Sequence, residues 1–369
     1  MAQFLLDPRS NYAELDQYLK DLGVQHILLV CGASMDRLAI APYMNSLTER
    51  LGIQVTRFSE FAPNPSWASC EKGTEVYLEN GCDAVIAVGG GSAMDVGKCI
   101  ALWSYAGVGR ASSEVLLAVE PTKLVAIPTT AGTGSEATRF AVIYKDGKKT
   151  SIDDPAMLAQ AVVLDGRLLS ELPPYHRRAT MMDALCHAIE SFWSVNSTEL
   201  SRAYAMDAIH QIMKNIESYL ANEPAGNEAM LMAANRAGKA INITKTTAGH
   251  AMCYKLTTKF GMAHGHAAGV CVGALWPYMK ERVRLHPEDC QDPRGVAHLN
   301  ECFRQLEEEL KCHDFAQILL RLGLSAPSVK LTEADYDELA ASVNVDRLAN
   351  HPMKLSPEEI KALYHTILG

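Results

Sequence analysis

The chain has 369 residues, of which 48% are hydrophobic and 21% are charged. This composition excludes wholesale disorder, and at roughly 100–200 residues per domain the length predicts about two domains. There are 34 basic and 43 acidic residues, a net charge of −9, with no long run of either sign. A phosphate-backbone footprint needs clustered Lys and Arg, so we expect no nucleic-acid partner.

The sequence carries no membrane or export signal. No apolar stretch reaches the roughly 18 residues of a membrane-spanning helix. The N-terminus, Met1 to Pro8, lacks the basic and apolar regions of a secretory signal. Ten cysteines are scattered without a Cys-x-x-Cys pair, as is typical of reduced thiols. We therefore expect a cytoplasmic protein with no membrane partner.

Short β-rich runs alternate with helical patterns in the first part of the chain. A helix is predicted at 71–80, and the strands are predicted at 25–31, 55–58, 83–88, 123–127 and 161–165. Strands that are separated by helices are typical of βαβ units and of a parallel sheet.

The composition changes after Pro173-Pro174, where Ala, Met, Leu and Glu with helical periodicity dominate. The predicted helices are 175–193, 199–221, 227–243, 247–259, 266–284, 295–308, 313–322, 333–344 and 356–367. We therefore predict an α/β domain over 1–172 and an all-helical domain over 173–369.

A glycine-rich turn, Gly89-Gly90-Gly91-Ser92, directly follows the predicted strand 83–88. Consecutive glycines let backbone N–H groups approach a pyrophosphate, and the positive end of the following helix would face the same place. The alternative is a plain strand-to-helix turn in which Asp95 and Lys98 form a local pair.

A second loop rich in hydroxyl groups, Pro-Thr-Thr-Ala-Gly-Thr-Gly-Ser-Glu-Ala-Thr over 128–138, follows the predicted strand 123–127. Such loops at the carboxyl ends of parallel strands can wrap a nucleotide. A polar loop whose hydroxyls cap the next element is the alternative. Together, the two loops favour a dinucleotide.

The helical half contains a candidate metal-ligand set. Asp183 and His187 are four residues apart, so they share one face of a helix with apolar flanks. His250 and His264 lie in another apolar stretch rich in Gly and Ala. A carboxylate with imidazoles suits Fe(II) or Zn(II), so these residues form a four-ligand set with open positions for a substrate oxygen.

The other histidines carry no such pattern. His26, His176 and His210 have no spacing partner. Polar surroundings predict surface positions for His286, His298, His313, His351 and His365.

Taken together, these motifs resemble the iron-containing (group III) alcohol dehydrogenases, in order from about residue 20 to 280. The resemblance implies a Rossmann-like N-terminal domain and an all-α C-terminal domain, the fold shared with dehydroquinate synthase. It also implies NAD(P)(H) in the cleft between them, Fe(II) or Zn(II) as the metal, and a homodimer.

The family's site residues carry over position by position. The resemblance implies that the metal ligands are Asp183, His187, His250 and His264. The implied cofactor-binding residues are Asn64, Gly89, Gly90, Gly91, Ser92, Asp95, Thr129, Thr130, Thr133, Ser135 and Lys149.

Two positions depart from the family pattern. Many members have a proton-relay histidine four residues after the position of His250, where this chain has Tyr254. Tyr254, His266 or solvent would then take its place. Many members also follow the strand 25–31 with an acidic residue that disfavours a 2′-phosphate, and this chain has Gly32 there.

The segment 242–255 is most similar to the branch of the family that includes the phosphonoacetaldehyde reductases, which make 2-hydroxyethylphosphonate in phosphonate biosynthesis. We expect Lys245, with help from Lys255 or Arg139, to hold the anion. Lys239 and Lys255 are equally well explained as solvated surface residues.

The sequence therefore predicts metal-dependent hydride transfer between NAD(P)H and an aldehyde. The alternatives are a broad-range alcohol or 1,2-diol dehydrogenase, a lyase related to 3-dehydroquinate synthase, and a nucleotide-binding module without catalysis. Net turnover of NAD(P)H with a simple aldehyde is expected of either dehydrogenase, whereas the lyase and the nucleotide-binding module would show none.

Overall fold

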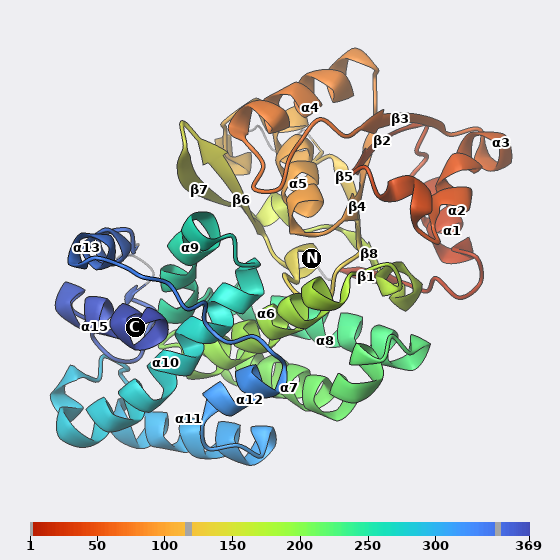
Figure 1. The fold of residues 1–369 in the computed structure, drawn as a ribbon. Coiled ribbons are helices and arrows are strands. Elements are labelled where there is room, and N and C mark those ends of the chain that lie inside the picture. The colour runs from red at the N-terminus through yellow and green to blue at the C-terminus, as the bar shows by residue number, and fades with distance from the viewer. Residues whose placement is uncertain (1–2, 115–119, 344–347) are drawn as a thin grey trace. The chain divides into compact units, whose positions relative to one another are not determined.

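The computed structural model describes residues 3–114, 120–343 and 348–369. These residues form two compact units (Figure 1). The first comprises Met1–Thr130, Gly134–Glu171 and Asn222–Leu231, and the second comprises Ala131–Thr133, Leu172–Ala221 and Met232–Gly369.

The first unit is built on a six-stranded parallel sheet with the strand order β1-β8-β5-β4-β2-β3. Its strands are β1 (Phe4–Leu6), β2 (His26–Cys31), β3 (Gln54–Phe58), β4 (Ala84–Gly89), β5 (Lys123–Pro128) and β8 (Ala161–Val163). The predicted parallel sheet is confirmed. An antiparallel hairpin of β6 (Phe140–Lys145) and β7 (Lys148–Asp153), which the sequence analysis did not predict, forms a separate sheet.

Helices cover both faces of the six-stranded sheet (Figure 1). Ile27, Ile86 and Ile127 share one buried cluster with residues of three helices, α1 (Ala13–Asp21), α2 (Ala41–Asn45) and α3 (Leu47–Leu51). The opposite face packs against α5 (Gly91–Ala106), which in turn packs against α4 (Trp67–Glu79). Gly97 makes this close packing possible, because a Cβ there would lie 2.7 Å from the Cβ of Ala87.

The second unit is helical, as predicted. Its helices are α6 (Pro174–Trp193), α7 (Glu199–Leu220), α8 (Pro224–Thr244, from Met232 onward), α9 (Ala248–Phe260), α10 (His264–Leu285), α11 (Gly295–Leu310), α12 (Phe315–Arg321), α13 (Glu333–Ala341) and α15 (Pro357–Leu368). Short 3-10 turns lie at 35–37, 112–114, 135–137, 155–157, 166–169 and 287–289.

Helix α10 is central to the second unit, because it packs against α6, α9, α12 and α15. An aromatic cluster fixes part of this packing: the ring of Trp276 lies 5.7 Å from that of Trp193 and 5.5 Å from that of Phe303. Because α6 and α9 both pack against α10, the three helices that carry the four predicted metal ligands are neighbours.

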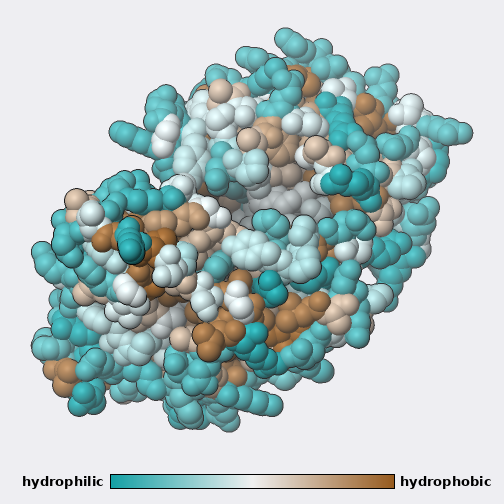
Figure 2. Space-filling view, viewed as in Figure 1, coloured by the Kyte–Doolittle hydropathy of each residue, from teal (hydrophilic) through white to brown (hydrophobic). Residues whose placement is uncertain are grey.

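Hydrophilic side chains predominate on the face drawn in Figure 2, and hydrophobic residues form several separate patches there. Among the described residues, no helix combines the length and hydropathy needed to cross a bilayer.

Candidate functional site

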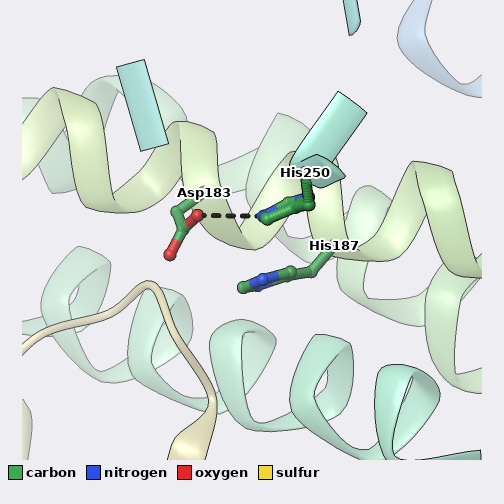
Figure 3. Close-up of side chains that lie close together, drawn as sticks. All are labelled: Asp183, His187 and His250. Carbon is green, nitrogen blue, oxygen red and sulfur yellow. Dashed lines mark hydrogen bonds and ion pairs between the residues drawn. The ribbon is translucent and has the colours of Figure 1, made fainter. Parts of the chain in front are cut away.

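Three predicted metal ligands come together in the second unit (Figure 3). Asp183 and His187 lie one turn apart on α6, and His250 lies in the first turn of α9. Their donor atoms all lie within 4.8 Å of one another, and the three side chains are buried. Nε2 of His250 is 3.3 Å from Oδ1 of Asp183, and the two imidazole rings stack with centroids 4.4 Å apart.

The fourth predicted ligand, His264, borders this group. It is the first residue of α10, and its Nε2 lies 4.0 Å from Oδ1 of Asp183. The His264 side chain is 37% exposed, whereas the side chains of the other three residues are buried. Gly265 lets α10 begin this close to α6, because a Cβ there would lie 2.0 Å from the carbonyl oxygen of Ala179 and 2.5 Å from Cβ of Asp183.

Glu190 is a member of the site to which the sequence analysis gave no role. It is fully buried on α6, and its carboxylate accepts hydrogen bonds from Nδ1 and the backbone N–H of His250. The same carboxylate accepts bonds from the backbone N–H (3.1 Å) and hydroxyl (2.5 Å) of Thr247. A carboxylate on one ring nitrogen fixes the tautomer of a histidine and leaves the other nitrogen for a metal, so Glu190 orients His250.

Charges in this group depend strongly on one another. Burial opposes the charged form of His250, but Glu190 and Asp183 raise its pKa to about 9. Burial also opposes ionisation of Glu190 and Asp183, yet the nearby histidines hold the pKa of Glu190 at about 2 and that of Asp183 well below its usual range. Burial lowers the pKa of His187 to about 4.

The donor set fits a divalent metal. Two buried carboxylates, Asp183 and Glu190, lie against His250, and a divalent cation held by the neutral imidazole would balance their negative charge. In the part of the chain that the structure describes, Nδ1 of His187 is buried without a hydrogen-bond partner. Carboxylate oxygen with imidazole nitrogen suits Fe(II) or Zn(II), the metals expected from the sequence.

The two candidates for proton transfer have different surroundings. Tyr254 stacks on His264, with ring centroids 5.5 Å apart. Both ring nitrogens of His266 are engaged: Nδ1 with the hydroxyl of Tyr175 and Nε2 with the carbonyl oxygen of Ser325, each at 3.0 Å. These bonds account for His266 as a structural residue, so Tyr254 is the better candidate.

The glycine turn and the hydroxyl-rich loop lie next to each other in the first unit. The backbone N–H of Thr129 donates to the carbonyl oxygen of Gly89 at 2.9 Å, and α5 begins at Gly91. A Cβ at Gly89 would lie 2.6 Å from Cβ of Ala93, and one at Gly90 would lie 3.3 Å from Cγ2 of Thr130. Glycine therefore keeps the backbone at the start of α5 free of side-chain carbon atoms, which a close approach of a pyrophosphate requires.

Asp95 and Ser135 contact each other within the first unit. The Ser135 hydroxyl donates to Oδ1 of Asp95 at 2.9 Å, and the backbone N–H of Val142 donates to Oδ2 at 3.1 Å. Burial raises the pKa of Asp95, and Lys98 and Lys149, which lies on β7, oppose part of this shift. In place of the local pair of Asp95 with Lys98 that the alternative interpretation of the turn envisaged, Ser135 bridges the two residues and accepts a hydrogen bond from Lys98 at 2.8 Å.

The other predicted nucleotide residues have different local settings. Ser92 is in the first turn of α5, and Thr130 lies beside Gly90. Asn64 is exposed in the left-handed conformation, with φ 58°. Thr133 belongs to the second unit by its contacts.

The basic residues expected to hold a substrate anion differ in their partners. The ammonium group of Lys255 lies 2.7 Å from Glu338, and the guanidinium of Arg139 lies 2.8 Å from Asp153. Lys245 is exposed in the turn between α8 and α9, with φ 59°. It lies two residues before Thr247, which binds Glu190.

One predicted surface histidine is buried. His351 is fully inaccessible, and neither ring nitrogen has a hydrogen-bond partner among the described residues. The surface prediction was wrong because the polar neighbours of His351 turn away from it. The side chain of Asn350 bonds to Asn196, and its backbone carbonyl accepts a bond from Val195.

Comparison with known proteins identifies the family. Residues 8–166 match the sequence model described as iron-containing alcohol dehydrogenase, and residues 178–368 match that of the C-terminal part of the Fe-containing alcohol dehydrogenase family. A phosphonoacetaldehyde reductase from Streptomyces viridochromogenes is 32% identical over 76% of this chain and 75% of its own length.

Solved structures agree with this result. An iron-containing alcohol dehydrogenase from Thermotoga maritima matches with a TM-score of 0.85 and 26% identity, covering 100% of this chain and 98% of that one. A sulfoacetaldehyde reductase from Bifidobacterium kashiwanohense, solved in complex with NAD+, matches with a TM-score of 0.82 and 25% identity over 99% and 96%. The chain belongs to the iron-containing alcohol dehydrogenase family and is an oxidoreductase that acts on CH–OH groups.

Proposed function

We propose that the protein is a metal-dependent, NAD(P)H-linked reductase of short aldehydes that carry a phosphonate or similar anion. The proposed reaction is the reduction of phosphonoacetaldehyde to 2-hydroxyethylphosphonate. The observation that carries the metal-dependent chemistry is the buried group of Asp183, His187 and His250, with Glu190 behind it and His264 at its border.

Each residue has a defined task in this proposal. Asp183, His187, His250 and His264 hold the metal, and Glu190 fixes the tautomer of His250. When bound, Fe(II) or Zn(II) supplies Lewis acidity toward an aldehyde oxygen, and a reduced nicotinamide supplies the hydride. Tyr254, stacked on His264, is the proposed proton donor to the developing alcohol.

The cofactor is proposed to bind the carboxyl ends of β4 and β5. Bare backbone N–H groups from Gly89 to Ser92 would receive the pyrophosphate at the start of α5. The hydroxyls of Thr129, Thr130 and Thr133 would line the nucleotide, with Asn64 and Lys149 as further contacts.

The substrate class is supported by two relatives. The names of the 32% identical relative and of one structural neighbour both describe acetaldehydes that carry a strongly acidic group, a phosphonate or a sulfonate. A dianion on a protein of net charge −9 needs a local cation. Lys245 is the proposed anchor, because it precedes the Thr247–Glu190 contact at the entry to α9.

A second candidate, a broad-range alcohol dehydrogenase, is favoured by the partners of two other basic residues. Lys255 and Arg139 already face the carboxylates of Glu338 and Asp153, so a substrate anion would compete with them. If Lys245 is also structural, the substrate is uncharged.

Steady-state rates with aldehydes of matched length, with and without a phosphonate group, test the proposal. The protein would be reconstituted with Fe(II) or Zn(II) and assayed with NADH and with NADPH. We expect kcat/KM to be highest for phosphonoacetaldehyde. A preference for uncharged aldehydes would support the second candidate, and no net turnover of cofactor with any aldehyde would contradict both.

Two variants locate the anion site. Lys245→Ala is expected to raise KM for phosphonoacetaldehyde by about one to two decades, the value of a partly desolvated charge-assisted hydrogen bond, with little change for an uncharged aldehyde. Lys255→Ala is the matched control, because it removes a lysine that pairs with Glu338. Equal losses on both substrates in Lys245→Ala would assign Lys245 to the fold.

The resemblance to the family also supports a homodimer in the cytoplasm. Sedimentation equilibrium of the purified protein would test the dimer.

A further inference from the structure

Lys98 is a buried cation for which the proposed reaction has no use. It lies on the second turn of α5, and only 1% of its surface is exposed. Burying an ammonium group is costly unless its hydrogen bonds are satisfied. The burial of Lys98 therefore calls for a structural or functional explanation.

All three N–H donors of Lys98 have partners in the segment that follows β5. The ammonium group donates to the hydroxyl of Ser135 at 2.8 Å, to the hydroxyl of Thr138 at 2.9 Å and to the carbonyl oxygen of Phe140 at 2.9 Å. The Ser135 hydroxyl in turn donates a hydrogen bond to Asp95, which lies three residues before Lys98 on the same face of α5. The buried carboxylate of Glu136 adds a favourable charge.

These contacts join the two segments proposed to receive the cofactor. Helix α5 begins at the glycine turn, and the residues that Lys98 holds end the hydroxyl-rich loop. Asp95 also connects α5 to the hairpin, because it accepts a hydrogen bond from the backbone N–H of Val142 on β6. Both oxygens of Asp95 and the hydroxyl of Ser135 are thus used inside the protein.

We propose that Lys98 is a positioning residue for the dinucleotide: it fixes the end of the hydroxyl-rich loop against α5 and so sets the shape of the backbone that binds the cofactor. Asp95 and Ser135, which the family resemblance places at the cofactor, act in the same brace. The inference rests on the proposed function, because it concerns the same cofactor site.

Binding of NADH and NADPH to the metal-free protein, followed by nicotinamide fluorescence, tests the proposal without turnover. Lys98→Met keeps the length of the side chain and removes its donors. We expect it to raise the dissociation constant about tenfold or more. Thr138→Val, which removes one acceptor and keeps the shape, should raise it by a smaller factor.

Lys123→Met is the matched control. Lys123 also donates to a backbone carbonyl, that of Leu22 at 2.8 Å, but it stands at the start of β5, the opposite end from the loops. Its loss should leave the dissociation constant within about twofold of the parent value. In the metal-loaded enzyme, Lys98→Met should raise KM for the cofactor while kcat at saturation changes much less.

The outcomes separate the inference from the proposed function. If the parent protein binds neither dinucleotide, the proposed function fails. If the parent binds and folded Lys98→Met binds equally well, or no worse than Lys123→Met, the role of Lys98 is refuted. Should Lys98→Met not fold, Thr138→Val decides, and unchanged binding in that variant overturns the proposal.

Discussion

The carboxylate of Glu190 binds His250 at two points, the ring Nδ1 and the backbone N–H. The two residues lie on different helices, α6 and α9, so one carboxylate fixes both the orientation of the imidazole and the start of its helix. Gly249 allows this approach, because a Cβ there would lie 3.1 Å from Oε1 of Glu190.

Glu190→Gln should therefore weaken metal binding. An amide in this place removes the negative charge that supports His250, and outer partners of this kind are typically worth about 10–100-fold in metal affinity. Competition with a chromophoric chelator measures the change. Asp292→Asn is the control, because Asp292 is another buried carboxylate of the same unit and pairs with Arg294. An unchanged affinity in Glu190→Gln would show that His250 does not depend on this carboxylate.

His264→Ala should remove bound metal and turnover together, because it deletes the proposed fourth ligand. The matched control is His266→Ala two residues later, whose loss breaks bonds to Tyr175 and Ser325. That control should unfold more easily yet retain metal. Metal analysis of the purified proteins distinguishes the two, and full metal content in His264→Ala would exclude His264 as a ligand.

The surroundings of Gly32 predict that NADPH is accepted at least as well as NADH. Gly32 follows β2, and its carbonyl oxygen accepts a hydrogen bond from the guanidinium of Arg57, which also pairs with Asp36. A 2′-phosphate here would meet no acidic side chain at position 32 and would compete with Asp36 for the guanidinium of Arg57. Gly32→Asp should raise KM for NADPH selectively, and Arg57→Ala should do the same more weakly. A strong preference of the parent for NADH would contradict this assignment.

His351 should make the metal-free protein sensitive to acid. Burial lowers its pKa to about 4, although Glu190 opposes part of this shift. In the unfolded chain the same ring takes up a proton near its ordinary value of 6.5. Between pH 6.5 and 4 the unfolded state therefore binds more protons, and the free energy of unfolding falls as the pH is lowered.

The expected loss from His351 between pH 7 and pH 5 is about 2 kcal/mol. Urea unfolding of the parent and of His351→Leu at these two pH values measures it. The variant should lose less stability on acidification, since it has no proton to gain at this position. The same decrease in both proteins would show that other groups, such as His187, cause the acid sensitivity.

Most strands of the parallel sheet and the helices of the second unit could be predicted because their patterns are local, whereas β1 and the helices α1 to α3 were not predicted. The apolar run 83–88 ends in glycines and becomes β4, and the periodic segment 175–193 becomes α6 within one residue. The hairpin of β6 and β7 was missed although signals for it were present. Its first strand, Phe140–Lys145, is mainly apolar, and Asp146-Gly147 is typical of a two-residue hairpin turn, whereas only the second strand, Lys148–Asp153, is mainly polar. Its place is set by contacts with α5, which no local pattern encodes.

The metal ligands could be predicted because ligation demands particular residue types at helical spacing. The sequence also contained a signal for Glu190 as a member of the site, since it is an acidic residue on the same apolar helix, three residues after His187. The burial of Lys98 and of His351 depends on chain segments far away in the sequence, so spacing alone could not show that these two residues are buried.

Helix α8 begins in the first compact unit and continues into the second. In the first unit it meets Gly166 so closely that a Cβ there would lie 2.7 Å from the backbone nitrogen of Glu228. A fragment ending at residue 172 would lack this neighbour and expose the surface that it covers. The first compact unit is therefore not one continuous stretch of the chain and could not be transferred as such. A chimaera between family members should exchange residues 222–231 together with the N-terminal half, even though they lie about fifty positions beyond it.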